Sequence, residues 1–489
     1  MRLGSKFPLK WILFISVVAF LSAAFYLKSS EEMVGFGFPL DDAWIHQTYA
    51  RNLAQEGEWS YIVGVPSAGS TSPLWTTILS LGPLLNLDPR FWTYLIGIGF
   101  SILLGLISSK WFTVRTEARS NWGWFIGMLV VLEWHLIWAS VSGMETLVFA
   151  TLSVAVLRLL DLNRLKPFLL GILIGIGIWI RPGAVTLLLP CLFVIVTDKP
   201  SGKLKAIIKL GLGFLILLMP YMIFNSLLTG SIWPNTFYAK QAEYTILSQA
   251  PLLTRLFNQL IQPLIGIGAV LVPGILYEVI YTLRKGNWSR IAGLLWVFTY
   301  LGMYALRLPV TYQHGRYAIP TIPVILIFGL EGVWRWVKLD SSITRERILS
   351  RLWLASAVAL QVAFVFVGAQ AYSRDVAIIE TEMVDAAKWI AKNTEHDALV
   401  AAHDIGALGY FGHRNLLDLA GLISPEVIPF IRDEEAISAY LNERGADYLM
   451  TFPGWYPNLI EGRKMLYKSN AEFSLEAGGE NMAIYQWGY

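Results

Sequence analysis

The chain has 489 residues, of which 55% are hydrophobic and 15% are charged, with 20 Trp and a mean hydropathy of +0.52. A soluble protein of this length needs far less apolar surface to fill its core, so the composition predicts a polytopic membrane protein. The single cysteine, Cys191 in an apolar run, excludes a disulfide framework and favours a small buried hydrophobe. The net charge of +3 comes from basic residues at helix ends, so no nucleic-acid partner is expected.

Twelve apolar runs are candidate membrane helices, judged against the roughly 20 residues that a helix needs to cross a bilayer. They lie at residues 11–27, 73–88, 91–112, 122–140, 144–160, 167–180, 183–197, 206–227, 263–283, 291–307, 318–337 and 352–370. We interpret the first run as an uncleaved helix, because its cleavage signal is weak and many more spans follow.

Basic residues predict how the helices are oriented. Lys and Arg concentrate in six segments, at residues 2–10, 110–119, 158–166, 199–209, 284–290 and 338–351. The positive-inside rule can place all six segments in the cytoplasm on one condition. The apolar run at residues 73–88 must dip into the membrane or lie along its surface, and not cross it. The prediction is about eleven crossings within a transmembrane domain of residues 1–371, with a cytoplasmic N-terminus and an external C-terminus.

This topology brings several short connections to the external face, beside an acidic first loop at residues 28–72. They are the turns 142–145 and 181–183 and the loops 233–241 and 312–317. The apolar runs on either side of the second turn have only 14 and 15 residues, about 21 to 22 Å, which is too short for a full hydrocarbon core. We expect them to end below the surface and leave a water-filled recess.

Residues 372–489 change in character. Their pattern predicts an amphipathic helix at 384–392, a strand at 398–402 and a β segment at 448–451. They are expected to form a small extracytoplasmic α/β domain of about 115 residues, a normal domain size. His403 and Asp404 in this domain are adjacent potential metal ligands without a third, which favours a structural role.

Two adjacent carboxylates, Asp41 and Asp42, are the first candidates for chemistry. Pro39 fixes the entry of a stretch that is predicted to be helical over 43–54, so one interpretation is a helix cap and a first-turn acid. One Asp is enough for a cap, so the other interpretation is a general base that takes a proton from a substrate hydroxyl. Glu145, at the mouth of a helix, either complements the helix dipole or acts in the same recess.

A few cations oppose the positive-inside trend on the external face, namely Arg181, Lys240, His314 and Arg316. Arg181 interrupts an apolar stretch, so we expect it to pair with a carboxylate, for which Glu145 is the candidate. Together these cations suit a phosphate whose ester tail stays in the lipid, because Arg binds phosphate oxygens bidentately. His314 alone would be an ordinary hydrogen-bonded loop residue, but beside Arg316 it becomes a candidate ligand.

Aromatic residues near the predicted external face allow two interpretations. They include Trp44, Trp59, Trp75 and Trp233. They fit an interfacial belt or platforms on which sugars stack, and composition cannot separate the two. Neither a P-loop nor a Gly-x-Gly-x-x-Gly motif after a strand is present, so no nucleotide site is expected.

An ordered set of short motifs lies between residues 38 and 320. The motifs are Asp41–Ala54, Gly69–Trp75, Ser142–Thr146, Arg181–Gly183, Pro234–Lys240 and Gly315–Tyr317. The set resembles the GT-C superfamily of polyprenyl-phosphate-sugar-dependent glycosyltransferases, and most closely the terminal arabinofuranosyltransferase type of actinobacterial cell-wall assembly. The resemblance implies a GT-C-like plasma-membrane enzyme that transfers a sugar, with inversion, from a polyprenyl phosphate to a hydroxyl of a cell-envelope glycan or glycolipid on the outer face.

The resemblance also implies roles for individual residues. The family's first-loop acid falls on Asp41, which is then expected to be the base that deprotonates the acceptor, with Asp42 beside it. The second carboxylate falls on Glu145. The donor phosphate ligands fall on Lys240, Arg316, His314 and Arg181. The family often has an acidic residue after Arg-Pro where this chain has Gly183, so only the Arg of that turn is carried over.

No metal or other cofactor is expected, because cations already present can neutralise a monophosphate. A divalent ion held by two carboxylates is the less favoured alternative. Two other functions stay open: an oligosaccharide or phospho-sugar transferase acting on lipid or protein, and a transporter or flippase of lipid-linked sugars. Transport is less favoured, because no inverted repeat is visible and the acids lie in a loop instead of discontinuous midplane helices.

Overall fold

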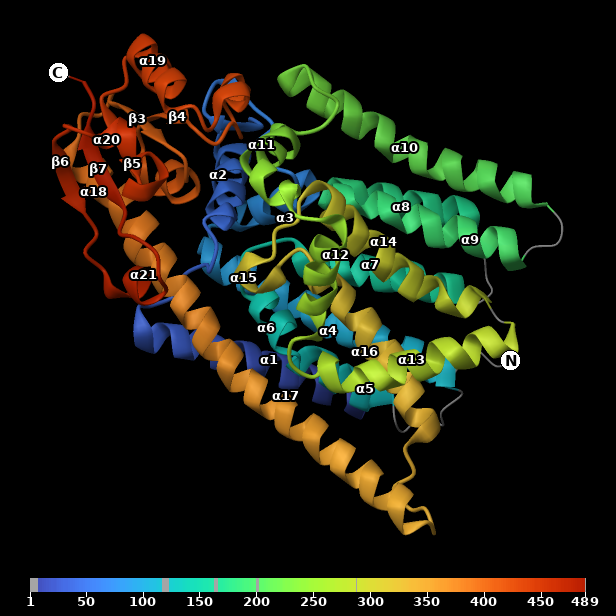
Figure 1. The fold of residues 1–489 in the computed structure, drawn as a ribbon. Helices are drawn as coiled ribbons and strands as arrows, with labels where there is room; N and C mark the ends of the chain where they lie inside the picture. Colours follow the sequence, from blue (N-terminus) through green and yellow to red (C-terminus); the bar gives the residue numbers. More distant parts are fainter. Residues whose placement is uncertain (1–7, 117–122, 162–165, 199–201, 287, 489) are drawn as a thin grey trace.

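The computed structural model consists of a helical bundle and a smaller C-terminal part that contains a β-sheet (Figure 1). The structure describes residues 8–116, 123–161, 166–198, 202–286 and 288–488. Parts of five of the basic segments lie outside the described residues, namely 2–7, 117–119, 162–165, 199–201 and 287. The long helix α17 (Thr344–Ile378) runs from the bundle to the C-terminal part.

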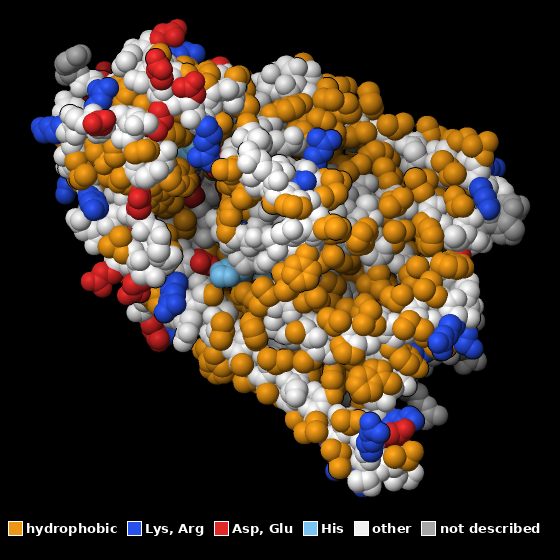
Figure 2. Space-filling model, viewed as in Figure 1, with side chains coloured by type: hydrophobic (Ala, Val, Ile, Leu, Met, Phe, Trp, Pro, Cys, Tyr) orange, Lys and Arg blue, Asp and Glu red, His pale blue; other side chains and the backbone are white. Residues whose placement is uncertain are grey.

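Apolar helices form the bundle. They are α1 (Leu9–Met33), α4 (Pro89–Thr116), α5 (Gly123–Leu132), α7 (Thr146–Asp161), α8 (Pro167–Ile180), α9 (Leu188–Asp198), α10 (Lys203–Thr229), α13 (Gly268–Lys285), α14 (Ala292–Arg307), α16 (Ile322–Trp336) and α17. In the described ranges, seven helices are long and apolar enough to cross a membrane, or eight if α5 and the bent α6 (Trp134–Ser140) form one span. Their apolar side chains cover much of the bundle surface (Figure 2). The polytopic membrane class is confirmed, while the count of eleven crossings stays a prediction.

Several short helices agree with the predicted interruptions. α8 has 14 residues, and α9 has 11 after a 3-10 turn at Pro182–Leu187. α3 (Pro73–Leu84) has 12 residues, too few to cross a bilayer, as expected for an element that dips into the membrane. α1 continues to Met33, so the first loop begins later than residue 28. Cys191 is fully buried, as predicted.

Buried ion pairs join several helices at one end of the bundle. Arg115 on α4 pairs with Asp161 at 3.0 Å and also with Glu331 on α16, which in turn binds Arg290. Arg335 pairs with Glu278 on α13 at 2.7 Å. α4, which has 28 residues, begins beside the C-terminal part and reaches this network at Arg115, near its other end. The described portions of two basic segments, around 115 and 290, therefore meet at the end of the bundle away from the C-terminal part.

Other short elements lie at the end of the bundle that faces the C-terminal part (Figure 1). They are α2 (Asp42–Gln55), the β1–β2 hairpin (Ser60–Ile62 and Val65–Pro66), α11 (Asn235–Glu243), α12 (Leu252–Ile261) and α15 (Tyr312–Gly315). α2 confirms the helix predicted at 43–54. Trp44 and Trp75 are buried among these elements, so neither is a membrane-belt residue nor a sugar platform.

The C-terminal part is an α/β unit. Its strands are β3 (Leu399–Ala402), β4 (Asn415–Asp418), β5 (Tyr448–Thr451), β6 (Met465–Lys468) and β7 (Ala483–Gln486), and its helices are α18 (Asp385–Asn393), α19 (Glu434–Arg444), α20 (Pro457–Ile460) and α21 (Glu472–Glu476). The strand order is β4-β3-β5-β7-β6, with β3 parallel to β4 and β5, and β7 antiparallel to its neighbours. α18, β3 and β5 confirm the three predicted elements. The expected boundary at 372 falls inside α17, which continues through a π-helical turn (Ile379–Val384) into α18.

Candidate active site

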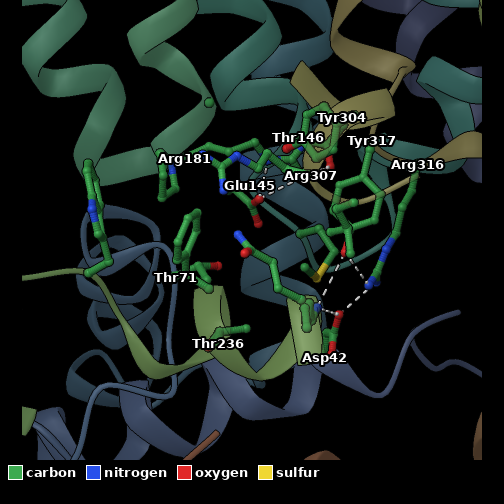
Figure 3. A pocket seen from close by; sticks show the side chains of 18 of the residues that line it. Asp42, Thr71, Glu145, Thr146, Arg181, Thr236, Tyr304, Arg307, Arg316 and Tyr317 are labelled. Carbon is green, nitrogen blue, oxygen red and sulfur yellow. Dashed lines mark hydrogen bonds and ion pairs between the residues drawn. The ribbon is translucent and has the colours of Figure 1, made fainter. Parts of the chain in front are cut away.

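A cavity of about 400 Å³ lies at this end of the bundle, with α2 and α11 on one side and the turns that carry Glu145 and Arg181 on the other (Figure 3). Its charged and polar wall includes Asp42, His46, Glu145, Arg181, Lys240, Arg307, Arg316 and Tyr317. Its apolar wall includes Ile45, Met144, Val185, Trp233, Phe237, Met303 and Leu308. Five of the seven residues that the sequence proposes for the site therefore share one cavity, at the place where a recess was expected.

Asp42 forms an ion cluster with two cations from distant parts of the chain. Its Oδ2 lies 2.7 Å from Nη1 of Arg316 and 3.2 Å from Nζ of Lys240. The hydroxyl of Tyr317 accepts hydrogen bonds from the same two cations, at 3.1 and 3.4 Å. Burial favours the neutral form of Asp42, but Lys240 and Arg316 outweigh it and hold the pKa of Asp42 far below its ordinary value. The cavity thus contains an ionised carboxylate whose Oδ2 contacts both cations.

An unusual backbone turn precedes Arg316. Gln313, His314 and Gly315 have φ values of 54°, 56° and 61°, a left-handed conformation that non-glycine residues rarely adopt. A Cβ on Gly315 would overlap the side chain of Gln262, so glycine is required there. Consecutive strained residues persist only where the surroundings impose them, and here they fix the direction in which the chain delivers Arg316.

Glu145 and Arg181 form the buried pair that the sequence predicts. Glu145 Oε1 accepts a hydrogen bond from Nε of Arg181 at 2.8 Å and lies 2.7 Å from its Nη2. Its second oxygen, Oε2, has no hydrogen-bond partner among the described residues and lies 3.9 Å from Nε2 of His46. The turn before Glu145 packs closely against α2, because Gly143 has φ 81° and a Cβ there would overlap that of Ala43. One oxygen of Glu145 is therefore buried at the wall of the cavity without a hydrogen bond among the described residues.

Asp41 has quite different neighbours from Asp42. Its Oδ2 and Oδ1 accept hydrogen bonds from the backbone N–H groups of Gly406 and Ala407, both at 2.7 Å. It precedes α2 but makes no capping hydrogen bond to that helix, so the capping interpretation is wrong for Asp41. A Cβ on Gly406 would overlap the carbonyl oxygen of Asp41, so this approach requires glycine. Asp41 thus fastens the C-terminal part to the bundle.

This attachment is expected to depend on pH. Burial and the nearby Asp404 raise the pKa of Asp41 from 3.8 to about 7, although the two N–H donors oppose the shift. Between these values the folded protein keeps a proton that the unfolded chain has lost, so stability falls as pH rises toward 7. We expect the thermal midpoint of the protein in lipid nanodiscs to fall between pH 5 and pH 7.5. The slope should be shallower in Asp41→Asn, and an equal slope in both proteins would contradict the assignment.

A second cavity, of about 390 Å³, lies between the bundle and the C-terminal part, where the surface is hollowed in Figure 2. Asp42, Lys240 and Arg316 line both cavities. The second cavity is also lined by Asp41, Glu243, Tyr244, Tyr312, His403, Asp404, Arg432, Phe452 and Trp455. The ion cluster of Asp42 is therefore a wall that two cavities share.

His314 is the one proposed residue that lines neither cavity. Its Nε2 lies 2.8 Å from Oδ2 of Asp375 on α17, and its ring meets Trp134 and Trp138 edge to face. These contacts hold the imidazole beside α17. We therefore leave His314 out of the proposed phosphate ligands.

Several lining residues were missed or assigned differently from the sequence. His46 follows Asp42 by four residues on α2, a spacing that puts both on one helix face and could have identified it. Arg307, in the last turn of α14, lines the first cavity and has no ion pair in the part of the chain that the structure describes. His403 and Asp404, expected to be structural, line the second cavity. Only the tertiary contact between the C-terminal part and the bundle reveals this.

Comparisons with known proteins bear on the fold. A family model described as a domain of unknown function (DUF8728) matches residues 367–485, and no curated protein sequence matches the chain. The structure of ArnT from Cupriavidus metallidurans bound to undecaprenyl phosphate aligns with a TM-score of 0.63 at 13% identity, over 97% of this chain and 98% of ArnT. The archaeal oligosaccharyltransferase AglB from Archaeoglobus fulgidus, in complex with an inhibitory peptide and a dolichol-phosphate, aligns with a TM-score of 0.56 at 13% identity, over 92% of this chain and 70% of AglB.

These alignments define the class of the fold. The chain has the multi-pass GT-C fold of membrane glycosyltransferases, as the sequence motifs imply. The arabinofuranosyltransferase AftD from Mycobacteria aligns with a TM-score of only 0.43 at 14% identity, over 99% of this chain and 42% of AftD, so the resemblance to that type stays a prediction.

Proposed function

We propose that the protein is an inverting glycosyltransferase that moves a sugar from a polyprenyl phosphate to a hydroxyl of an acceptor glycan. One observation carries the proposal: the cluster of Asp42, Lys240 and Arg316 is the wall between two cavities. A transferase without a covalent intermediate needs two substrates to meet at one centre, held in the geometry of attack. A carboxylate and two cations at that boundary supply a base and an anion site.

The first cavity has the chemistry of a donor site. Apolar side chains such as Val185 and Leu308 suit a prenyl chain, and the cations suit its phosphate. Lys240 and Arg316 bind Asp42 in the free protein. When the donor enters, its phosphate takes over these contacts, so one anion replaces another and no buried cation is left unpaired. Arg307 adds a cation without a carboxylate partner among the described residues.

The chemical step follows from this exchange. Asp42, released from its cations, accepts the proton of the acceptor hydroxyl, and the oxygen attacks the anomeric carbon opposite the phosphate. The bond from that carbon to the phosphate oxygen breaks, and the cations stabilise the departing polyprenyl phosphate. Glu145 Oε2 accepts a hydrogen bond from a donor sugar hydroxyl. We assign the base to Asp42 and not to Asp41, because both oxygens of Asp41 are occupied by backbone N–H groups.

The orientation and the substrates are part of the proposal. The ion-paired basic network lies at the opposite end of the bundle from the site, which supports a site on the outer face, an external C-terminal part and a cytoplasmic N-terminus. The acceptor is a cell-envelope glycan or glycolipid. The motif resemblance supports an arabinofuranose-type sugar as the first donor to test, and the proposed reaction has no metal in it.

Transfer can be measured directly with the purified protein in lipid nanodiscs. Radiolabelled polyprenyl-phosphate pentoses and hexoses are supplied with envelope glycans in the presence of EDTA, and labelled glycan is counted. We expect transfer from one donor, and a donor KM raised at least about tenfold in Arg316→Gln, because a charge-assisted phosphate contact is lost. Arg345→Gln, at an exposed arginine far from the site, is the matched control. Movement of lipid-linked sugar across the bilayer without transfer would support a flippase instead.

A further inference from the structure

The second cavity is built at the carboxyl ends of three parallel strands. His403 and Asp404 directly follow β3, Ala420 and Leu422 follow β4, and Phe452 and Trp455 follow β5. Loops at this edge of a parallel sheet are the usual place for a ligand in α/β folds. The bundle closes the other side of the cavity, so the C-terminal part presents its binding edge to the candidate active site.

Trp455 is held as a platform in this cavity. Trp455 is 41% exposed, whereas tryptophan is usually mostly buried in folded proteins. The ring of His403 stands edge-on to it, with centroids 4.7 Å apart and planes at 87°, and Phe452 packs at 5.5 Å. His403 is itself buried and fixed by Tyr456 and Glu243, at 2.9 and 3.4 Å. The indole is thus oriented by its neighbours and still open to a flat apolar ligand face.

Outside the ion cluster that it shares with the first cavity, the second cavity is lined by more carboxylates than cations. Asp404 has no hydrogen bond or ion pair in the described ranges, and burial raises its pKa from 3.8 to about 6, while the neighbouring His403 opposes this. Glu243 and Asp41 supply further carboxylates, and Arg432 is the arginine that the C-terminal part adds to the wall. Lys240 and Arg316 also line this cavity, but Asp42 engages both in the free protein. Outside that ion cluster three carboxylates and one arginine face the cavity, so the wall suits several hydroxyl donors around a ring and favours a neutral ligand over an anionic one.

We propose that the second cavity is the acceptor subsite and that it binds an uncharged sugar ring stacked on Trp455, with Asp404 accepting from its hydroxyls. This inference rests on the proposed function, in which the shared Asp42 takes the proton of the acceptor. The C-terminal part would then recognise the acceptor, and the acceptor would be a neutral glycan. The first cavity, by contrast, would bind the anionic phosphate of the donor.

Binding can be measured without turnover. Full-length protein in nanodiscs is titrated with the methyl glycosides of glucose, galactose and arabinofuranose, and with methyl glucuronide as the anionic counterpart, by saturation-transfer difference NMR. We expect at least one neutral glycoside to bind about tenfold more tightly than the uronide. Trp455→Ala should weaken neutral binding about fivefold to tenfold, and Trp455→Phe should weaken it less, because a ring remains. Trp288→Ala, at an indole that is 48% exposed elsewhere, is the matched control.

The outcomes separate this inference from the proposed function. Equal glycoside binding in wild type, Trp455→Ala and Asp404→Asn overturns the subsite, as does tighter binding of the uronide. Transfer with an acceptor KM that is unchanged in Trp455→Ala overturns the subsite and leaves the transferase intact. Absence of transfer with every donor, together with Trp455-dependent glycoside binding, counts against the transferase and supports a neutral-sugar site.

Discussion

Asp42→Asn is expected to lower the turnover of sugar transfer by about 10² to 10⁴, because an amide cannot accept the proton of the acceptor hydroxyl. The same change removes the anion that engages Lys240 and Arg316 in the free protein. Donor affinity should therefore be unchanged or higher, since the phosphate no longer displaces a carboxylate. Turnover and the dissociation constant of a non-reactive polyprenyl phosphate, measured on the same preparation, test both halves.

This pattern separates a base from a structural acid. Loss of a merely structural carboxylate would weaken donor binding together with turnover. Asp340→Asn, at an exposed aspartate far from the site, controls for the change of charge. Asp41→Asn is expected to act mainly through the docking of the C-terminal part. If Asp42→Asn turned over normally while Asp41→Asn did not, the base would be Asp41, as the motif resemblance implies.

The charged wall of the first cavity could be predicted because charged residues are scarce in the apolar and external segments of this chain. Arg181, Lys240 and Arg316 stand out as cations in apolar or external segments, and ionisable residues there need a reason. The partner of Arg181 was identifiable, because Glu145 was the other isolated charge at the same depth. Positive-inside topology then brought these segments to one face without any knowledge of packing.

The choice between Asp41 and Asp42 could not be made from the sequence. Asp41 directly precedes α2 and Asp42 is its first residue, so their positions in the sequence are nearly equivalent. Their roles differ only because their side chains contact different parts of the chain. Asp41 reaches a backbone 365 residues further on, and Asp42 reaches a lysine 198 residues further on. The first contact is set by the docking of the C-terminal part and the second by the position of α11 in the bundle, and residue patterns carry no local signal for either. The sequence predicts a structural role for His403 and Asp404, whereas the docking of the C-terminal part against the bundle makes them line the second cavity.

Arg181→Leu is expected to lower the free energy of unfolding by about 3 to 5 kcal/mol, because it leaves the Glu145 carboxylate buried and unpaired. The guanidinium and carboxylate lie 2.7 Å apart, and their side chains are only 8% and 3% exposed. The double variant Arg181→Leu/Glu145→Leu should recover most of this loss, since two apolar side chains replace a buried ion pair at little net cost. Thermal unfolding in detergent, followed by near-UV circular dichroism, gives the comparison.

Activity of the double variant then decides what the pair is for. Glu145 Oε2 makes no hydrogen bond within the described residues, although it is buried and Glu145 lines the first cavity. A carboxylate kept only for stability would be better satisfied. We therefore expect the double variant to fold and still show a donor KM raised about tenfold or more, because the sugar loses a charged hydrogen-bond acceptor. Normal transfer by a folded double variant would reduce Glu145 and Arg181 to a structural pair and restrict the donor site to the cations around Asp42.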